Sequence, residues 1–253
     1  MNSLRIYLGS IIGNNDMYLE SLLDDDDVYL SKTDNEIIKK YINDNYTITG
    51  NLTISKDHVV DCAAGVTVDN GSITSLTNGL FRWGKIKSYF DCNGCNITSL
   101  KGSPKEVGGY FDCSYCNNLK TLEGAPKIVG ESFYCDRCVN LKSLEGAPEK
   151  VGRSFGCCGC SGLTTLKGAP KKTDNGFYCN SCINLTSLEG APKEVGWSFV
   201  CSYCHNLTSL EGAPEKVGRL FDCGNCLNLK ITDSDRGKYK LHKYSAYIPQ
   251  TIE

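Results

Sequence analysis

The sequence lacks the features by which most enzymes, membrane proteins and nucleic-acid-binding proteins are recognised. Its 253 residues contain three histidines, His58, His205 and His242, which are scattered along the chain. No glycine-rich phosphate-binding loop is present, and the nucleophilic and acidic residues form no catalytic pattern. The formal net charge is −2, so a polyanion is not indicated as a partner. We therefore expect a protein that is not an enzyme, uses no cofactor and binds no nucleic acid.

Long apolar runs are also missing. The chain starts MNSLRIYLGSIIGN, and this apolar stretch is too short and too interrupted for a secretory signal or a membrane span. No other stretch is long enough to cross a bilayer. The sequence therefore predicts a cytoplasmic protein without a membrane partner.

A repeat dominates what is present. Residues 111–126 read FDCSYCNNLKTLEGAP, and residues 133–148 read FYCDRCVNLKSLEGAP. The first cysteines of successive copies are 22 residues apart, at Cys113, Cys135, Cys157, Cys179, Cys201 and Cys223. Cys92 begins a copy that is one residue shorter. A fixed period of this length is typical of a solenoid.

Each unit follows the pattern V-x3-F-x-C-x2-C-x2-L-x2-L-x-G-A-P. Phe133 and Cys135 are two residues apart, which is strand spacing, so both side chains face one side. The Gly-Ala-Pro at the end breaks any continuing strand or helix. One unit cannot bury its apolar side alone, but stacked units can. We expect a β-rich solenoid of about eight 22-residue coils, with a parallel β-sheet on one face.

The chain divides into three parts on this basis. Residues 1–60 are expected to form a helical and β cap, with helical patterns at residues 16–23 and after Thr33, where Thr33 and Glu36 resemble a capping box. Residues 46–55 alternate like a strand around a turn. Residues 61–230 form the solenoid, and residues 231–253 form a C-terminal cap strand and tail.

The unit F-x-C-x-x-C-x-x-L-x-x-L resembles the leucine-rich repeat, with the second cysteine where that family places a buried Asn or Cys. The segment LTSLEGAPKEVG is similar to the repeats of short-coil leucine-rich repeat proteins of bacteriophages and large DNA viruses. The resemblance covers Val66 to Leu229. It implies a binding protein that engages a host factor or a virion component, in the host cytoplasm or the virion. Phe and Cys replace the usual Leu, and no helical stretch is present on the return side, so we expect an irregular or 3₁₀ outer face.

The cysteines leave three alternatives. Seven C-x-x-C pairs with 17 or 18 residues between them satisfy a zinc-site spacing. Both cysteines nevertheless fall at inward positions, where cysteine packs as a small hydrophobe, and no cation points inward to offset thiolate charge. Reduced packing thiols are the favoured interpretation. A metal or iron–sulfur cluster and disulfides within coils are the alternatives.

Residues at the outward strand positions vary between copies, whereas the scaffold residues hardly change. In a solenoid this face is the usual binding surface. Exposed Tyr, Trp and Arg are enriched at protein interfaces, although tyrosine also suits an ordinary sheet face. We predict a protein partner at Tyr89, Asp91, Tyr110, Asp112, Tyr115, Tyr134, Asp136, Arg137, Arg153, Tyr178, Trp197, Tyr203 and Arg219. A metal- or cluster-carrying cysteine ladder and a structural spacer or virion building block are the alternative functions.

Overall fold

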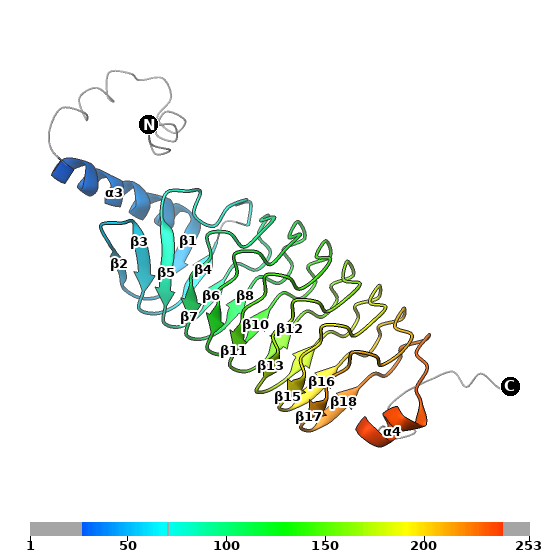
Figure 1. Cartoon of the computed structure of the whole chain (residues 1–253). Coiled ribbons are helices and arrows are strands. Elements are labelled where there is room, and N and C mark those ends of the chain that lie inside the picture. The colour runs from blue at the N-terminus through cyan, green and yellow to red at the C-terminus, as the bar shows by residue number, and fades with distance from the viewer. Residues whose placement is uncertain (1–26, 70, 240–253) are drawn as a thin grey trace.

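The computed structural model describes residues 27–69 and 71–239, and it confirms the solenoid. Coils follow one another along a single axis, with helix α3 (Asp27–Asn45) at one end and helix α4 (Asp233–Tyr239) at the other (Figure 1). The helical pattern at residues 16–23 and the tail from residue 240 lie outside the described residues.

Each coil contributes two short strands, so the solenoid has two sheets. Sheet A contains, in spatial order, β1 (Tyr46–Ile48), β4 (Val66–Val68), β6 (Phe90–Asp91), β8 (Phe111–Asp112), β10 (Phe133–Tyr134), β12 (Phe155–Gly156), β14 (Phe177–Tyr178), β16 (Ser198–Val200) and β18 (Leu220–Asp222). Sheet B contains β2 (Leu52–Ile54), β3 (Val59–Cys62), β5 (Arg82–Ile86), β7 (Glu106–Val107), β9 (Ile128–Val129), β11 (Lys150–Val151), β13 (Lys172–Thr173), β15 (Glu194–Val195) and β17 (Lys216–Val217). Only β1 and β2 pair antiparallel to their neighbours among these strands.

The interior is a set of side-chain ladders held in register. Phe133 of β10 pairs with Phe111 of β8 and with Phe155 of β12. From Phe90 to Phe221, successive phenylalanine rings stack with centroids 5.2–5.6 Å apart. The cysteines and leucines of the repeat are buried beside them. The return side consists of turns and irregular backbone, as expected.

Sheet B was not anticipated as a second sheet, because its strands are two residues long in most coils. Val129 points inward and Ile128 outward, which is the alternation of a strand. The chain then passes a tight corner at Gly130 to reach sheet A. A Cβ atom at Gly130 would lie 2.0 Å from the carbonyl oxygen of Gly108, so the corner as it is built here leaves no room for a side chain at Gly130.

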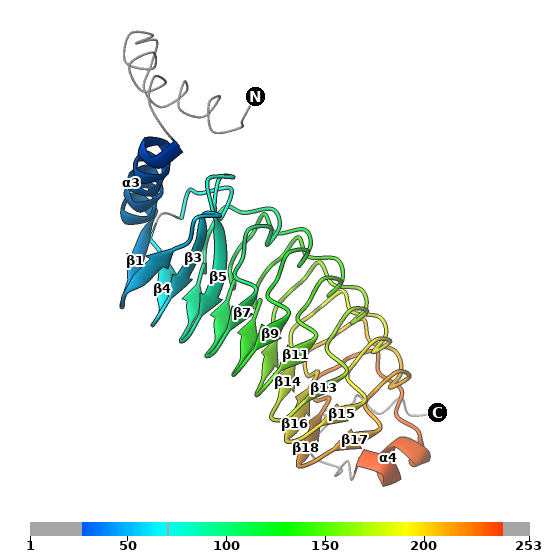
Figure 2. The same ribbon diagram turned by 60° about the vertical axis from the view of Figure 1, so that its left-hand side comes forward.

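The N-terminal end of the core is closed. Ile38 and Ile42 of α3 are buried, and the indole of Trp83 meets the ring of Phe90 edge-on at 5.8 Å. Figure 2 shows α3 and β1 beside β4 at this end. The proposed helix start at Thr33 was wrong, because α3 already runs from Asp27 and Thr33 lies inside it.

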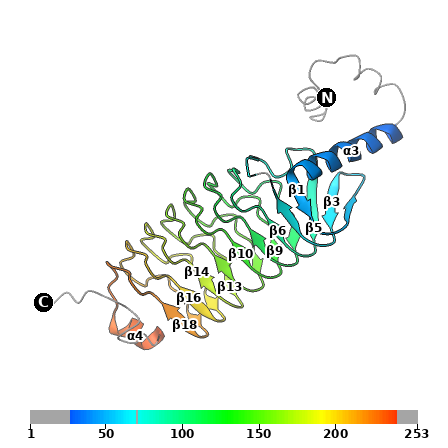
Figure 3. The ribbon, with the colours of Figure 1, turned by 180° about the vertical axis from the view of Figure 1, so that it is seen from behind.

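The C-terminal cap is a helix, so the expected cap strand was wrong. Thr232 and Asp235 form a capping box: the Asp235 N–H donates to Thr232 Oγ1 (3.2 Å), and the Thr232 N–H donates to Asp235 Oδ2 (2.9 Å). At the other end of α4, the ring of Tyr239 stacks on Phe221 with centroids 4.1 Å apart. The helix therefore sits at the end of the phenylalanine stack, next to β18 (Figure 3).

Candidate functional site

Three rows of outward side chains follow sheet A and the turn after it. The sheet row lies between Phe and the first cysteine of each coil: Asp91, Asp112, Tyr134, Gly156, Tyr178, Val200 and Asp222. The turn row is the second residue between the cysteines: Gly94, Tyr115, Arg137, Gly159, Ser181, Tyr203 and Asn225. The post-cysteine row follows the second cysteine: Asn117, Val139, Ser161, Ile183, His205 and Leu227. Neighbours in a row are one strand spacing apart, roughly 4.8 Å.

Every residue of the turn row has a left-handed backbone, with φ between 56° and 72°. This conformation costs an L-residue roughly 1–2 kcal/mol, and glycine much less. Gly94 and Gly159 adopt this conformation with little conformational strain. Tyr115, Arg137 and Tyr203 adopt it as well, although it strains their backbone. Backbone geometry therefore does not explain these three side chains, and strain that persists in this way points to a role for the side chain.

Several predicted residues contact one another between neighbouring coils. The guanidinium carbon of Arg137 lies 5.5 Å from the ring centroid of Tyr115, and that of Arg219 lies 4.5 Å from the ring of Trp197. Tyr115, Trp197 and Tyr203 remain 48%, 47% and 51% exposed. The two contacts therefore restrict the rings of Tyr115 and Trp197, which are both exposed.

The remaining predicted aromatic and basic residues are more enclosed or are paired. The rings of Tyr89 and Tyr110 stack on each other with centroids 5.1 Å apart, and both are half-buried. Tyr134 and Tyr178 are also half-buried. Arg153 forms an ion pair with Glu131 (3.1 Å). The predicted set therefore follows sheet A and both of its flanks instead of forming one compact site.

The three predicted aspartates are engaged with the backbone. Asp91 Oδ1 accepts the N–H of Asn93 (3.0 Å), and Asp112 Oδ1 accepts that of Ser114 (2.8 Å). Asp136 Oδ1 accepts the Cys158 N–H of the next coil (2.6 Å). Burial raises the pKa of both Asp112 and Asp136 above the usual range. These carboxylates serve the scaffold by fixing the turns.

A groove with a volume of about 660 Å³ lies where the turn row carries Gly159. Its lining comes from four successive coils: Tyr115, Asn117, Asp136, Arg137, Val139, Cys158, Gly159, Asn180 and Ser181. Cys158 is the extra cysteine between Cys157 and Cys160; it is half-buried, and its thiol donates to Asn180 Oδ1 (2.9 Å). The groove exists because Gly159 has no side chain between those of Arg137 and Ser181.

The sequence interpretation missed the post-cysteine row. Val139, Ile183 and Leu227 in this row are 40%, 44% and 54% exposed. Together with Tyr115 and Tyr203 they form what we call the apolar strip. The signal was available, because the residue after the second cysteine varies between polar and apolar types, whereas the position before it is always Cys and the position after it is Asn in every copy of this row except at Gly162.

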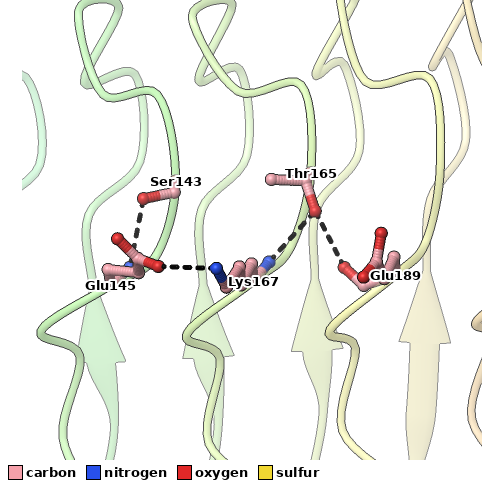
Figure 4. Close-up of polar contacts among 5 residues, drawn as sticks. All are labelled: Ser143, Glu145, Thr165, Lys167 and Glu189. Atoms are coloured by element: carbon pink, nitrogen blue, oxygen red, sulfur yellow. Dashed lines mark hydrogen bonds and ion pairs between the residues drawn. The ribbon is translucent and has the colours of Figure 1, made fainter.

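Another corner of each coil has the opposite composition. The residue before Gly-Ala-Pro, or Gly-Ser-Pro in the first of these coils, is charged, as is the one after it. Ion pairs join neighbouring coils here, such as Lys101–Glu123 (3.2 Å) and Glu145–Lys167 (3.3 Å). Figure 4 shows how Thr165 adds to this network by accepting the Lys167 N–H and donating to the Glu189 carbonyl. Charge is thus concentrated away from the apolar strip.

The buried thiols act as hydrogen-bond donors. The second cysteine of a coil donates to the carbonyl oxygen of the first cysteine of the preceding coil, with S–O distances of 3.0–3.2 Å from Cys116 to Cys226. Burial raises the pKa of Cys95 to about 12 and that of Cys226 to about 11. A thiol that donates in this way keeps its proton, whereas a metal ligand must lose it.

The cysteine alternatives can be set against this geometry. All sixteen cysteines are free, and fifteen are buried. Within residues 27–69 and 71–239, no group of three or more His, Cys, Asp or Glu side chains is arranged to hold a metal ion. The arrangement fits packing thiols, which was the favoured interpretation.

Comparison with family models, with curated proteins and with solved structures finds no match to the chain. In the part of the chain that the structure describes, no helix is both long and apolar enough to span a bilayer.

Proposed function

We propose that this chain is a non-enzymatic, protein-binding solenoid, and that its contact surface is the apolar strip with the adjoining turn row. One observation carries the proposal: charge is segregated around the coil. The corner at Gly-Ala-Pro is charged in every copy, whereas Arg137 and His205 are the only basic residues of the turn and post-cysteine rows, which contain no acid. Interface cores are likewise depleted of charge and enriched in aromatic residues and arginine.

The left-handed tyrosines support the same surface. Tyr115 and Tyr203 are about half exposed and occupy positions where glycine would be less strained. Exposed aromatic anchors dominate the binding energy of many interfaces. This moves the proposed surface from the centre of sheet A to its flank, because the aspartates of the sheet row are engaged in turns. The resemblance to viral repeat proteins favours a host factor or a virion component as the partner.

A site-specific photo-crosslinker tests the surface. The chain would carry p-benzoylphenylalanine in place of Tyr203 or, as a matched control, of Ile128, which is 41% exposed in sheet B among charged neighbours. We expect one discrete adduct in cells of the native host with the probe at position 203. The control should give none, because position 128 lies on the charged side.

Two results would contradict the proposal. One is the absence of any adduct in folded protein that carries the probe at position 203, together with the same result when the probe replaces Tyr115. The other is the same adduct formed equally from position 128, which would show contact without a preferred surface.

A further inference from the structure

The apolar residues of the post-cysteine row occur on every second coil. Val139, Ile183 and Leu227 are separated by 44 residues each time, and Ser161 and His205 stand on the coils between them. With strands roughly 4.7–4.9 Å apart, alternate coils repeat at about 9.6 Å. A linear partner that contacts all three residues must therefore present apolar groups at about this interval.

The backbone beside the apolar strip is already paired. The N–H of Tyr115 donates to the Asp136 carbonyl, that of Arg137 to Cys158, and that of Tyr203 to Gly224, at 2.7–2.8 Å. Gly159 and Ser181 make the same bond to Asn180 and Ser202. No open strand edge is left along this row, so a partner cannot bind here by adding a strand. Recognition must come from side chains, which leaves a helix or a polyproline II segment.

The backbone spacing of paired strands, roughly 4.8 Å, is shorter than the 5.2–5.6 Å between the enclosed phenylalanine rings, and it is the backbone spacing that we compare with these two conformations. A polyproline II helix rises about 3.1 Å per residue and has three residues per turn, so one side repeats every 9.3 Å or so. An α-helix brings residues i and i+7 to one side about 10.5 Å apart. Over the two intervals from Val139 to Leu227, the mismatch is roughly 0.6 Å for polyproline II and roughly 1.8 Å for the α-helix.

Charge and side-chain type agree with this choice. The turn and post-cysteine rows offer no carboxylate and only two basic residues, and the carboxylate of Asp136, which lines the groove, already accepts the Cys158 N–H. A strongly charged segment would therefore find little complement. Proline-rich segments dock on aromatic side chains and need few backbone hydrogen bonds. Within the apolar strip, Tyr115 and Tyr203 lie on either side of Ile183 and the groove at Gly159.

We propose that the partner binds through an uncharged, proline-rich segment in polyproline II conformation that carries an apolar residue at every third position. This inference rests on the proposed function and specifies its partner.

Synthetic peptides test the inference on the full-length chain. The probe is a fluorescein-labelled peptide of five Leu-Pro-Pro repeats, compared with a peptide of the same composition and shuffled leucine spacing. A neutral amphipathic helix with leucine at positions i, i+3 and i+7 is the third ligand. Binding is followed by fluorescence anisotropy, and circular dichroism confirms that each variant is folded. We expect the repeat peptide to bind at least ten-fold more tightly than both others. Ile183→Asn should weaken it at least ten-fold, while Ile128→Asn should leave it unchanged.

The inference is overturned if the repeat peptide does not bind, if the helix binds more tightly, or if both asparagine variants behave alike. The crosslinking experiment separates these failures from failure of the proposed function. An adduct from Tyr203 without peptide binding would retain the surface and reject the polyproline II partner.

Discussion

Tyr203 and Gly159 occupy the same place in their coils, with φ values of 60° and 68°. The backbone does not distinguish them, but the surface does, because one contributes a half-exposed ring and the other leaves a groove. A protein that needed only a stable turn would gain from glycine at each of these positions. The turn row therefore shows where stability is given up for an outward side chain.

Replacing Tyr203 by glycine should raise the free energy of unfolding by roughly 0.5–1 kcal/mol, because relief of the left-handed strain exceeds the added entropy of the unfolded chain. The same change should abolish crosslinking from a probe at position 115. Urea denaturation measures the first effect. Tyr134→Gly is the matched control, since Tyr134 lies in strand β10 with ordinary φ, and this variant should be less stable than the parent. A loss of stability in Tyr203→Gly would contradict the argument.

At the scale of the coil, the two cysteines have different tasks. The second one ties its coil to the preceding coil through the carbonyl of Cys92, Cys113 or a later equivalent. This is the place that the resemblance to leucine-rich repeats gives to a buried asparagine, and the thiol supplies a single donor there. This hydrogen bond requires a protonated sulfur, so the free energy of unfolding should depend on pH.

The thiol ladder predicts a loss of stability in alkali. Unfolded cysteines lose their protons near pH 8.5, whereas burial raises the native pKa of Cys135 to about 11 and that of Cys223 to about 12. Between these two pKa values the native state binds more protons than the unfolded state. The free energy of unfolding therefore falls as pH rises, by about 1.4 kcal/mol per pH unit for each such thiol. The effect adds over the thiols whose pKa is raised by burial, so alkali should remove a large part of the free energy of unfolding.

Urea unfolding from pH 7.5 to 10.5, followed by fluorescence of buried Trp83 in a phosphine reductant, should show a falling midpoint above pH 9. A free energy of unfolding that stays constant between pH 8 and pH 10 would show that the thiols are not held protonated by the fold. Stability below pH 8 should be insensitive to these groups, since both states are then protonated.

The interior of the coil could be derived from the sequence, because Phe, Cys and Leu recur with a fixed period and bury together. Sheet B could not, since two-residue strands such as Lys150–Val151 have too short an alternation to separate from a turn. Helix α4 was not predicted, although Thr232 and Asp235 have the spacing of a helix-capping pair. The loss of the repeat pattern after Cys226 was interpreted as a last strand. The candidate surface was only partly found, since sequence spacing does not show which aspartates bond the backbone.

At the scale of the whole molecule, each coil contacts mainly its two neighbours, so stability is expected to vary along the axis. The N-terminal end is closed by α3 and by two antiparallel strands. The C-terminal end depends on α4, which buries none of its residues and is anchored by Tyr239. The Tyr239 hydroxyl donates to the Pro214 carbonyl (2.8 Å), and its ring covers Phe221.

Tyr239→Ala should therefore loosen the last coil first. Hydrogen exchange should accelerate at the amides of Cys201 and Tyr203, which donate to Asp222 and Gly224 of that coil. The amide of Cys113, which donates to Tyr134 in the middle of the solenoid, should keep its protection. Equal acceleration at both places would mean that the solenoid opens as one cooperative unit instead of fraying from its end.

The alternation in the post-cysteine row makes the pair of coils the unit of this surface. Since Val139, Ile183 and Leu227 recur every 44 residues, a tandem duplication or deletion of two units would lengthen or shorten the surface and leave its phase intact. Gain or loss of a single unit would keep the stacking of the interior but place two apolar or two polar coils side by side. Descendants of this gene that retain the same partner should accordingly differ in length by even numbers of repeats.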